Sequence, residues 1–183
     1  MASRVVPAPL AYLPNALTIL RLALIPIFIA VYVSAGDGSS WAAGWIFLVA
    51  GITDQVDGFL ARRWHVESQF GKLADPLADR LMIDSAAILL SLEGKLPWAG
   101  TVIILLRDAL LVGGYRLLMP RGYELNVTML GKVATWLLYL SVGILLVVGQ
   151  NTEWPLWLFW FALALALGAA AQYVLKARRE VAR

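Results

Sequence analysis

The chain has 183 residues, of which 61% are hydrophobic and 15% are charged. Soluble domains average about half apolar and a quarter charged residues, so this balance favours a chain embedded in lipid. The absence of Cys excludes disulfides and thiolate metal sites, and the single His65 excludes a metal site built from several histidines. A bound metal would have oxygen ligands, which favours Mg²⁺, Mn²⁺ or Ca²⁺ over Zn²⁺. The net charge of +3 is scattered among apolar runs, which argues against nucleic-acid binding and suits an anionic membrane surface.

Six apolar stretches approach the roughly 20 residues that a membrane-spanning helix needs. We expect spans at Asn15–Ser34, Trp41–Arg62, Pro76–Ser91, Pro97–Met119, Thr128–Val148 and Trp154–Lys176. The connections are short, which predicts antiparallel neighbours in an all-α integral membrane bundle that forms one domain over residues 1–183. The first stretch contains Arg21 and only a weak cleavage site at Val33-Ser34-Ala35, so we expect it to be retained as a span.

Basic residues in the connections, in the terminal segments and at the very ends of the spans are concentrated on one side of the predicted membrane. That side holds Arg4, Arg62, Arg63, Lys72, Arg121, Lys176, Arg178, Arg179 and Arg183. The connections on the other side contain one basic residue, Lys95. Because basic loops tend to stay in the cytoplasm, this asymmetry predicts that both termini are cytoplasmic.

Four aspartates form two pairs in the cytoplasmic half of the predicted bundle. Asp54 and Asp57 are three residues apart near the end of the second span, and Asp75 and Asp79 are four apart around the start of the third. Each spacing places both residues on one helix face. A charged Asp at mid-bilayer costs about 2.5–3.5 kcal/mol, so the cluster needs shared protons or bound cations. Two divalent cations would balance four carboxylates, as in many phosphoryl-transfer sites. The alternative, solvated residues at helix ends, explains one Asp better than two pairs.

Basic residues are expected near the same depth: Arg21, Arg107, Arg116 and Lys132. A cationic pocket beside a carboxylate–metal cluster suits a substrate with two phosphate-bearing parts. Two structural alternatives stay open. Arg107 could pair with Asp84 or Asp108, and Arg116 and Lys132 could extend to lipid head groups. An ion or proton transporter also uses intramembrane carboxylates. However, a transporter needs a polar path across the bilayer, and the outer halves of these spans are almost purely apolar.

The segment Asp54–Asp79 resembles the signature of the CDP-alcohol phosphatidyltransferase family, D-x2-D-G-x2-A-R-x8-G-x3-D-x3-D. The fixed positions are met by Asp54, Asp57, Gly58, Ala61, Arg62, Gly71, Asp75 and Asp79. The resemblance implies that the four aspartates hold two divalent cations, Mg or Mn, and that Gly58, Ala61, Arg62 and Gly71 shape the CDP site. It also implies that Asp79 is the catalytic base, which deprotonates an alcohol that attacks the β-phosphorus of CDP-diacylglycerol and releases CMP.

The acceptor alcohol is less sharply defined by the resemblance. Arg107, Arg116 and Lys132 are similar to positions that family members use for an acceptor phosphate. The opening Pro14–Arg21 and the chain length are similar to the phosphatidylglycerophosphate synthases of bacterial cytoplasmic membranes, which implies sn-glycerol 3-phosphate as acceptor. The run Gly131–Thr135 is similar to cardiolipin synthases of the same family, which implies phosphatidylglycerol instead. The family further implies a homodimer surrounded by membrane lipids.

Overall fold

A computed structural model of the chain describes residues 13–36, 39–64, 69–118, 129–149 and 152–181. Side chains are described at 16–36, 39–53, 78, 80–111, 113, 129–149 and 152–172. Over these residues the fold is helical with short turns. The helices are α2 (Leu13–Ala35), α3 (Trp41–Trp64), α4 (Gln69–Leu92), α5 (Trp98–Leu118), α6 (Met129–Val147) and α7 (Trp154–Val181). The predicted all-α class is confirmed, and one helix lies at each of the expected stretches.

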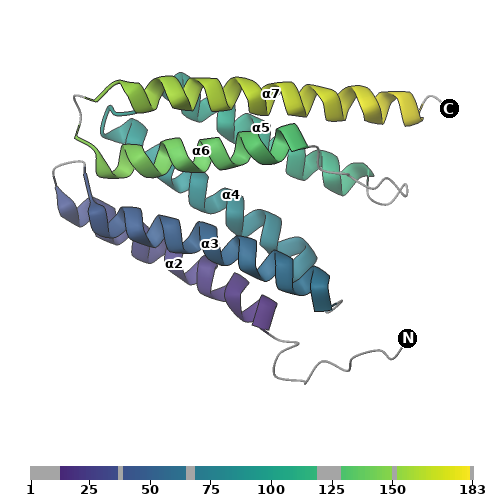
Figure 1. Ribbon diagram of the computed structural model, residues 1–183, viewed down its shortest axis with the longest axis horizontal. Coiled ribbons are helices and arrows are strands. Elements are labelled where there is room, and N and C mark those ends of the chain that lie inside the picture. The colour runs from purple at the N-terminus through teal and green to yellow at the C-terminus, as the bar shows by residue number, and fades with distance from the viewer. Residues whose placement is uncertain (1–12, 37–38, 65–68, 119–128, 150–151, 182–183) are drawn as a thin grey trace.

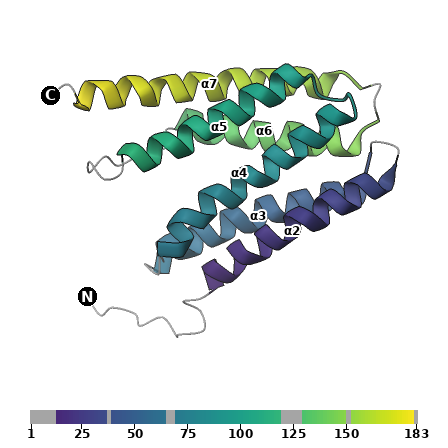
Figure 2. The ribbon, with the colours of Figure 1, turned by 180° about the vertical axis from the view of Figure 1, so that it is seen from behind.

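The helix α4 lies at the centre of the bundle, where it packs against α2, α3, α5 and α6. Figures 1 and 2 show it crossing obliquely between the α2–α3 pair and the group formed by α5, α6 and α7. Three of its alanines, Ala78, Ala86 and Ala87, are fully buried. Small side chains let helix backbones approach closely, so this alanine face allows α4 to contact four neighbours at once.

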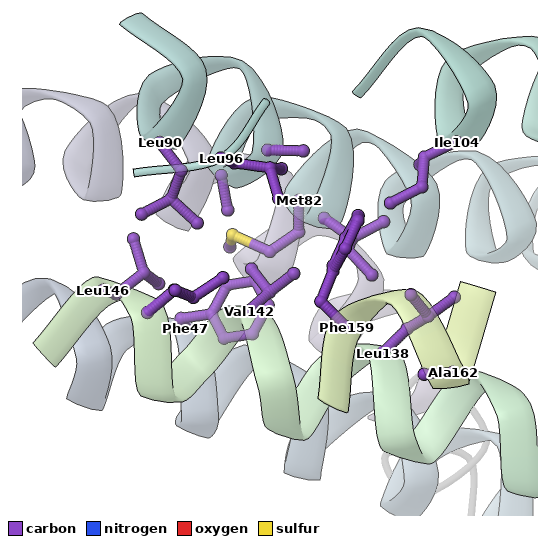
Figure 3. Close-up of a cluster of buried hydrophobic side chains, with 14 of the residues drawn as sticks. Phe47, Met82, Leu90, Leu96, Ile104, Leu138, Val142, Leu146, Phe159 and Ala162 are labelled. Atoms are coloured by element: carbon purple, nitrogen blue, oxygen red, sulfur yellow. The ribbon is translucent and has the colours of Figure 1, made fainter. Parts of the chain in front are cut away.

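All six helices contribute side chains to the hydrophobic core, part of which is shown in Figure 3. The Phe47 ring of α3 lies 6.1 Å from that of Phe28 on α2 and 5.0 Å from that of Tyr139 on α6, measured between centroids. Other members of this cluster are Met82, Leu90, Leu96, Ile104, Leu138, Val142, Leu146, Phe159 and Ala162. The aromatic contacts therefore join the α2–α3 pair directly to α6.

The connections at one end of the bundle are closed by specific polar contacts. Ser40 Oγ accepts a hydrogen bond of 3.1 Å from the backbone N–H of Ala43 at the start of α3, as an N-cap residue does. After α4 ends at Leu92, Gly94 has a φ of 72°, the left-handed conformation that favours glycine at this place. These residues explain why the chain turns sharply between antiparallel helices.

Lys95 is buried although it lies in the connection between α4 and α5. Its side chain donates from Nζ to the carbonyl oxygens of Leu145, at 3.0 Å, and Val148, at 2.5 Å, and the residue is 5% exposed. The last carbonyls of a helix have no intrahelical partner and form the negative end of its dipole. The lysine therefore caps the end of α6 and ties the α4–α5 connection to it.

The outward-facing surface of the described part is largely apolar, as a lipid environment requires. Leu110 is 75% exposed, Trp157 73% and Trp41 70%, whereas Arg21 is fully buried. Three helices in this part are long and apolar enough to cross a membrane, at Ala16–Ala35, Met129–Val147 and Trp154–Gln172. The sequences of α3, α4 and α5 carry the charged residues of the candidate site, which lowers their hydropathy.

Two helices extend beyond the predicted spans by five residues or more. The third span was expected to start at Pro76, but α4 begins at Gln69, and α7 continues past Lys176 to Val181. Hydropathy marks only the apolar part of a helix, whereas backbone hydrogen bonding can continue through polar residues on either side of it. As a consequence, Asp75 lies within α4 and not in the connection before it.

Candidate active site

The backbone places the four aspartates on two helices that pack against each other. Asp54 and Asp57 lie in the second half of α3, and Asp75 and Asp79 lie in the first half of α4. Both helices are continuous across their pair, so each pair shares a helix face, as the spacing predicted. Figures 1 and 2 show that the end of α3 and the start of α4 lie at the same end of the bundle.

The side chains of the signature motif lie outside the described ones. This holds for Asp54, Asp57, Gly58, Ala61, Arg62, Gly71, Asp75 and Asp79, and also for Arg116. The described side chains contain no group of three potential metal ligands among His, Cys, Asp and Glu. Cation binding by the quartet and CDP binding by its neighbours therefore remain predictions.

A buried ionic cluster directly follows the motif. Arg80, the residue after Asp79, donates from Nη1 to Asp108 Oδ1 at 2.5 Å and so joins α4 to α5. Arg107 donates to the same oxygen from Nε at 2.7 Å and lies 2.6 Å from it at Nη2. The side chains of Arg107 and Asp108 are 8% and 3% exposed, and that of Arg80 is 25% exposed. We call these three residues the Arg80–Asp108–Arg107 cluster.

The Arg80–Asp108–Arg107 cluster contains two cations and one carboxylate, so its formal charge is positive. Asp108 Oδ2 is buried and, within the described residues, has no hydrogen-bond partner. A guanidinium has five N–H donors, and Arg107 directs only Nε and Nη2 at Asp108 in the contacts above. The net positive formal charge of the cluster is suited to attract an anion.

The three predicted acceptor-phosphate residues are not equivalent in position. Arg107 pairs with Asp108, one of the two partners that the sequence offered for it. Arg116 lies in the last turn of α5, and the exposed Lys132 lies in the first turn of α6. Nine positions separate Arg107 from Arg116, or about two and a half helical turns, which places them on opposite sides of an ideal helix. The end of α5 and the start of α6 lie at the same end of the bundle as the aspartates (Figures 1 and 2).

Comparison with known proteins identifies the same family as the sequence motif. Residues 11–168 match the profile of the CDP-alcohol phosphatidyltransferase family. The chain belongs to this family. The match covers both aspartate-bearing helices and the whole Arg80–Asp108–Arg107 cluster.

Members of the family with related sequences have two kinds of name. A "Putative cardiolipin synthase" of Mycobacterium tuberculosis (strain CDC 1551 / Oshkosh) is 42% identical over 124 residues, which are 67% of this chain and 58% of that protein. A "Probable phosphatidylglycerophosphate synthase" of the same strain is 40% identical over 143 residues, which are 75% of this chain and 66% of that protein. The "CDP-diacylglycerol--glycerol-3-phosphate 3-phosphatidyltransferase" of Bacillus subtilis (strain 168) is 36% identical over 163 residues, or 82% of this chain and 83% of that protein.

Sequence reasoning missed part of the environment of the family motif. No role was predicted for Arg80 from the sequence, and Asp108 was named only as a possible partner for Arg107. The signal that could have found them is their type, because ionisable residues inside apolar helices are rare and usually paired. Their convergence on one oxygen required the packing of α4 against α5.

Proposed function

We propose that the chain transfers the phosphatidyl group of CDP-diacylglycerol to an alcohol acceptor, with sn-glycerol 3-phosphate as the main candidate. The observation that supports this most is the complete signature motif of the family, carried by two packed helices at one end of the bundle. The products would be phosphatidylglycerophosphate and CMP, so the enzyme would act in phospholipid biosynthesis.

The donor atoms of the motif suit Mg²⁺ or Mn²⁺. The four aspartates supply only oxygen, and each pair lies on one face of α3 or α4. Two divalent cations held by Asp54, Asp57, Asp75 and Asp79 would neutralise the pyrophosphate and the charge that develops on the leaving group. Gly58, Ala61, Arg62 and Gly71 would shape the CDP site, with Arg62 near the pyrophosphate.

In this mechanism Asp79 acts as the general base. It takes the proton from the acceptor hydroxyl, and the resulting oxygen attacks the β-phosphorus of CDP-diacylglycerol. The bond between this phosphorus and the oxygen of the α-phosphate breaks, and CMP leaves with the electron pair. Because Arg107 and Arg116 lie on opposite sides of α5, one phosphate would not contact both directly. Arg107, held by Asp108, would bind the acceptor phosphate, and Arg116 and Lys132 would attract it electrostatically from the same end of the bundle.

Phosphatidylglycerol is the second candidate acceptor, because a related protein at 42% identity carries the name "Putative cardiolipin synthase". Both acceptors carry a phosphate and a free primary hydroxyl, so the same base and cationic residues would serve either. They differ in size and in location, since one is dissolved in water and the other lies in the bilayer.

The topology we propose has six membrane-spanning helices, both termini in the cytoplasm, and the active site facing the cytoplasm of a bacterial-type inner membrane. Lys95, the one basic residue of the connections on the other side, is buried at the end of α6, so those connections expose no basic side chain in the described residues. A homodimer within the membrane lipids is proposed from the family alone.

A CMP-release assay on the purified full chain tests the function. CDP-diacylglycerol and Mg²⁺ are supplied with glycerol 3-phosphate, phosphatidylglycerol, inositol phosphate or serine, and the lipid product is identified by mass. We expect release with glycerol 3-phosphate and little release without an acceptor. Product from phosphatidylglycerol alone would establish the second candidate, and no release with any acceptor would overturn the proposal.

A further inference from the structure

We propose that Asp108 is a positioning residue that couples the helix of the catalytic base to the arginine that binds the acceptor. This inference rests on the proposed function, because it assigns its purpose to the transfer of a phosphatidyl group to a phosphorylated acceptor. It concerns a residue outside the signature motif, on a different helix.

The contacts place Asp108 between two parts of the site. On one side, Arg80 follows Asp79 directly on α4. The ion pair between Arg80 and Asp108 therefore restricts how the turn of α4 that carries Asp79 can rotate or slide along the helix axis. On the other side, Arg107 precedes Asp108 on α5 and directs both Nε and Nη2 at its carboxylate. A single oxygen, Oδ1, receives donors from both arginines, so neither guanidinium can shift without affecting the contact of the other.

Burial makes this link difficult to replace. Water cannot substitute readily for a carboxylate whose side chain is 3% exposed. Without the negative charge, Arg80 and Arg107 would be two cations near each other in a poorly hydrated site, and they would repel. We expect Arg107 to swing away and the α4–α5 contact to loosen, which would separate the acceptor phosphate from the base.

The kinetic consequence is specific. In Asp108→Asn, the KM for glycerol 3-phosphate should rise and kcat should fall. The ratio kcat/KM should therefore drop by about tenfold or more, as expected when charge-assisted hydrogen bonds are lost. KM for CDP-diacylglycerol should stay within about twofold, because the motif residues are unchanged. Asp108→Glu keeps the charge and should retain more of kcat/KM than Asp108→Asn does.

Ser91 and Thr101 offer a matched control on the same two helices. Their hydroxyl oxygens lie 2.6 Å apart, are buried, and join α4 to α5 near the opposite end of the helices. The double variant Ser91→Ala with Thr101→Val removes an uncharged link between the same elements. It should lower the unfolding temperature while leaving the KM for glycerol 3-phosphate and kcat close to those of the parent.

A double-mutant cycle provides a readout independent of turnover. Arg80→Gln, Asp108→Asn and the combined variant are compared by unfolding temperature, with and without glycerol 3-phosphate. Coupling predicts that the combined loss is smaller than the sum of the single losses, and that glycerol 3-phosphate stabilises the parent more than Asp108→Asn.

The outcomes separate the inference from the proposed function. A parent that releases no CMP with any acceptor overturns the function, while the unfolding cycle still reports the link. An active parent whose Asp108→Asn variant keeps its acceptor KM and kcat overturns the inference, as does a Ser91/Thr101 control with the same kinetic defect. If Asp108→Asn does not fold, Arg80→Gln alone should still lower kcat, and an unchanged kcat would overturn the coupling.

Discussion

Gly44 marks a close approach between α3 and the end of α6, and Gly44→Ala tests this contact. A Cβ at position 44 would lie 2.5 Å from Cγ2 of Val147, against an ordinary carbon–carbon separation of about 3.5–4.0 Å. The valine side chain is β-branched and stiff, so relief requires a rotamer change or a helix shift. Overpacking of this kind costs about 1–3 kcal/mol, whereas Ala gains only about 0.5–1 kcal/mol over Gly within a helix. Because a 2.5 Å contact is far inside the ordinary separation, the upper part of this cost range applies, and we expect a net loss of roughly 1–2 kcal/mol.

Intrinsic tryptophan fluorescence during heating in detergent measures this loss, since the chain has 8 Trp and no Cys for thiol dyes. At about 2–4 °C per kcal/mol, Tm should fall by about 2–8 °C. Gly168→Ala is the control, because its Cβ would meet nothing within 4 Å, and its Tm should stay level or rise. Adding Val147→Ala to Gly44→Ala should restore most of the lost stability. A Gly44→Ala protein as stable as the parent, or a loss that the second change does not relieve, would refute the close-approach argument.

The remaining predictions concern the site and the buried lysine. Activity should vanish in excess EDTA and return with Mg²⁺ or Mn²⁺, and full activity after dialysis against EDTA would contradict the two-cation proposal. Asp79→Asn should lower kcat by at least about 10²–10⁴-fold at every Mg²⁺ concentration. In Asp57→Asn, by contrast, added Mg²⁺ should restore part of the lost kcat. If Mg²⁺ returned Asp79→Asn to near the parent rate, Asp79 would be a metal ligand and not the base. Lys132→Ala and Arg116→Ala should each raise the KM for the acceptor more than the KM for CDP-diacylglycerol in steady-state kinetics. If neither variant changed the acceptor KM, these two residues would not contribute to binding the acceptor phosphate. Lys95→Met should lower Tm, because it removes two hydrogen bonds from a charged donor, each worth about 1.5–3 kcal/mol. Lys95→Arg keeps the charge and should lower Tm less. Equal Tm values for Lys95→Met and the parent would contradict the role of Lys95 in capping α6.

Local patterns were sufficient to predict the helices and the positions of the motif along them. Apolar stretches of nearly fixed length indicated six helices, and the spacing of Asp54 from Asp57 determined that they share a face, because helical periodicity is a property of the local chain. Helix ends were less predictable. The start of α4 at Gln69 lies ahead of the apolar region, and hydropathy does not report where backbone hydrogen bonding begins.

The pairing of charges could not be read from the sequence, because it depends on how helices cross. Arg107 had two candidate partners in the sequence, Asp84 and Asp108, and the structure pairs it with Asp108. Arg80 joins the same carboxylate across 28 positions of sequence, which only the packing of α4 on α5 brings together.

The amino-acid sequence by itself therefore determined the all-helical class, the family motif and the chemistry of its oxygen donors, since these depend on composition and on contacts within single helices. Tertiary structure decided which charges neutralise one another and which residues connect the base to its surroundings. Lys95 illustrates the difference: in the sequence it is a loop cation, but folding carries it to the carbonyls at the end of α6, 50 and 53 positions away. The physical reason is that a buried charge takes the partner that packing brings within hydrogen-bond distance, wherever that partner lies in the chain.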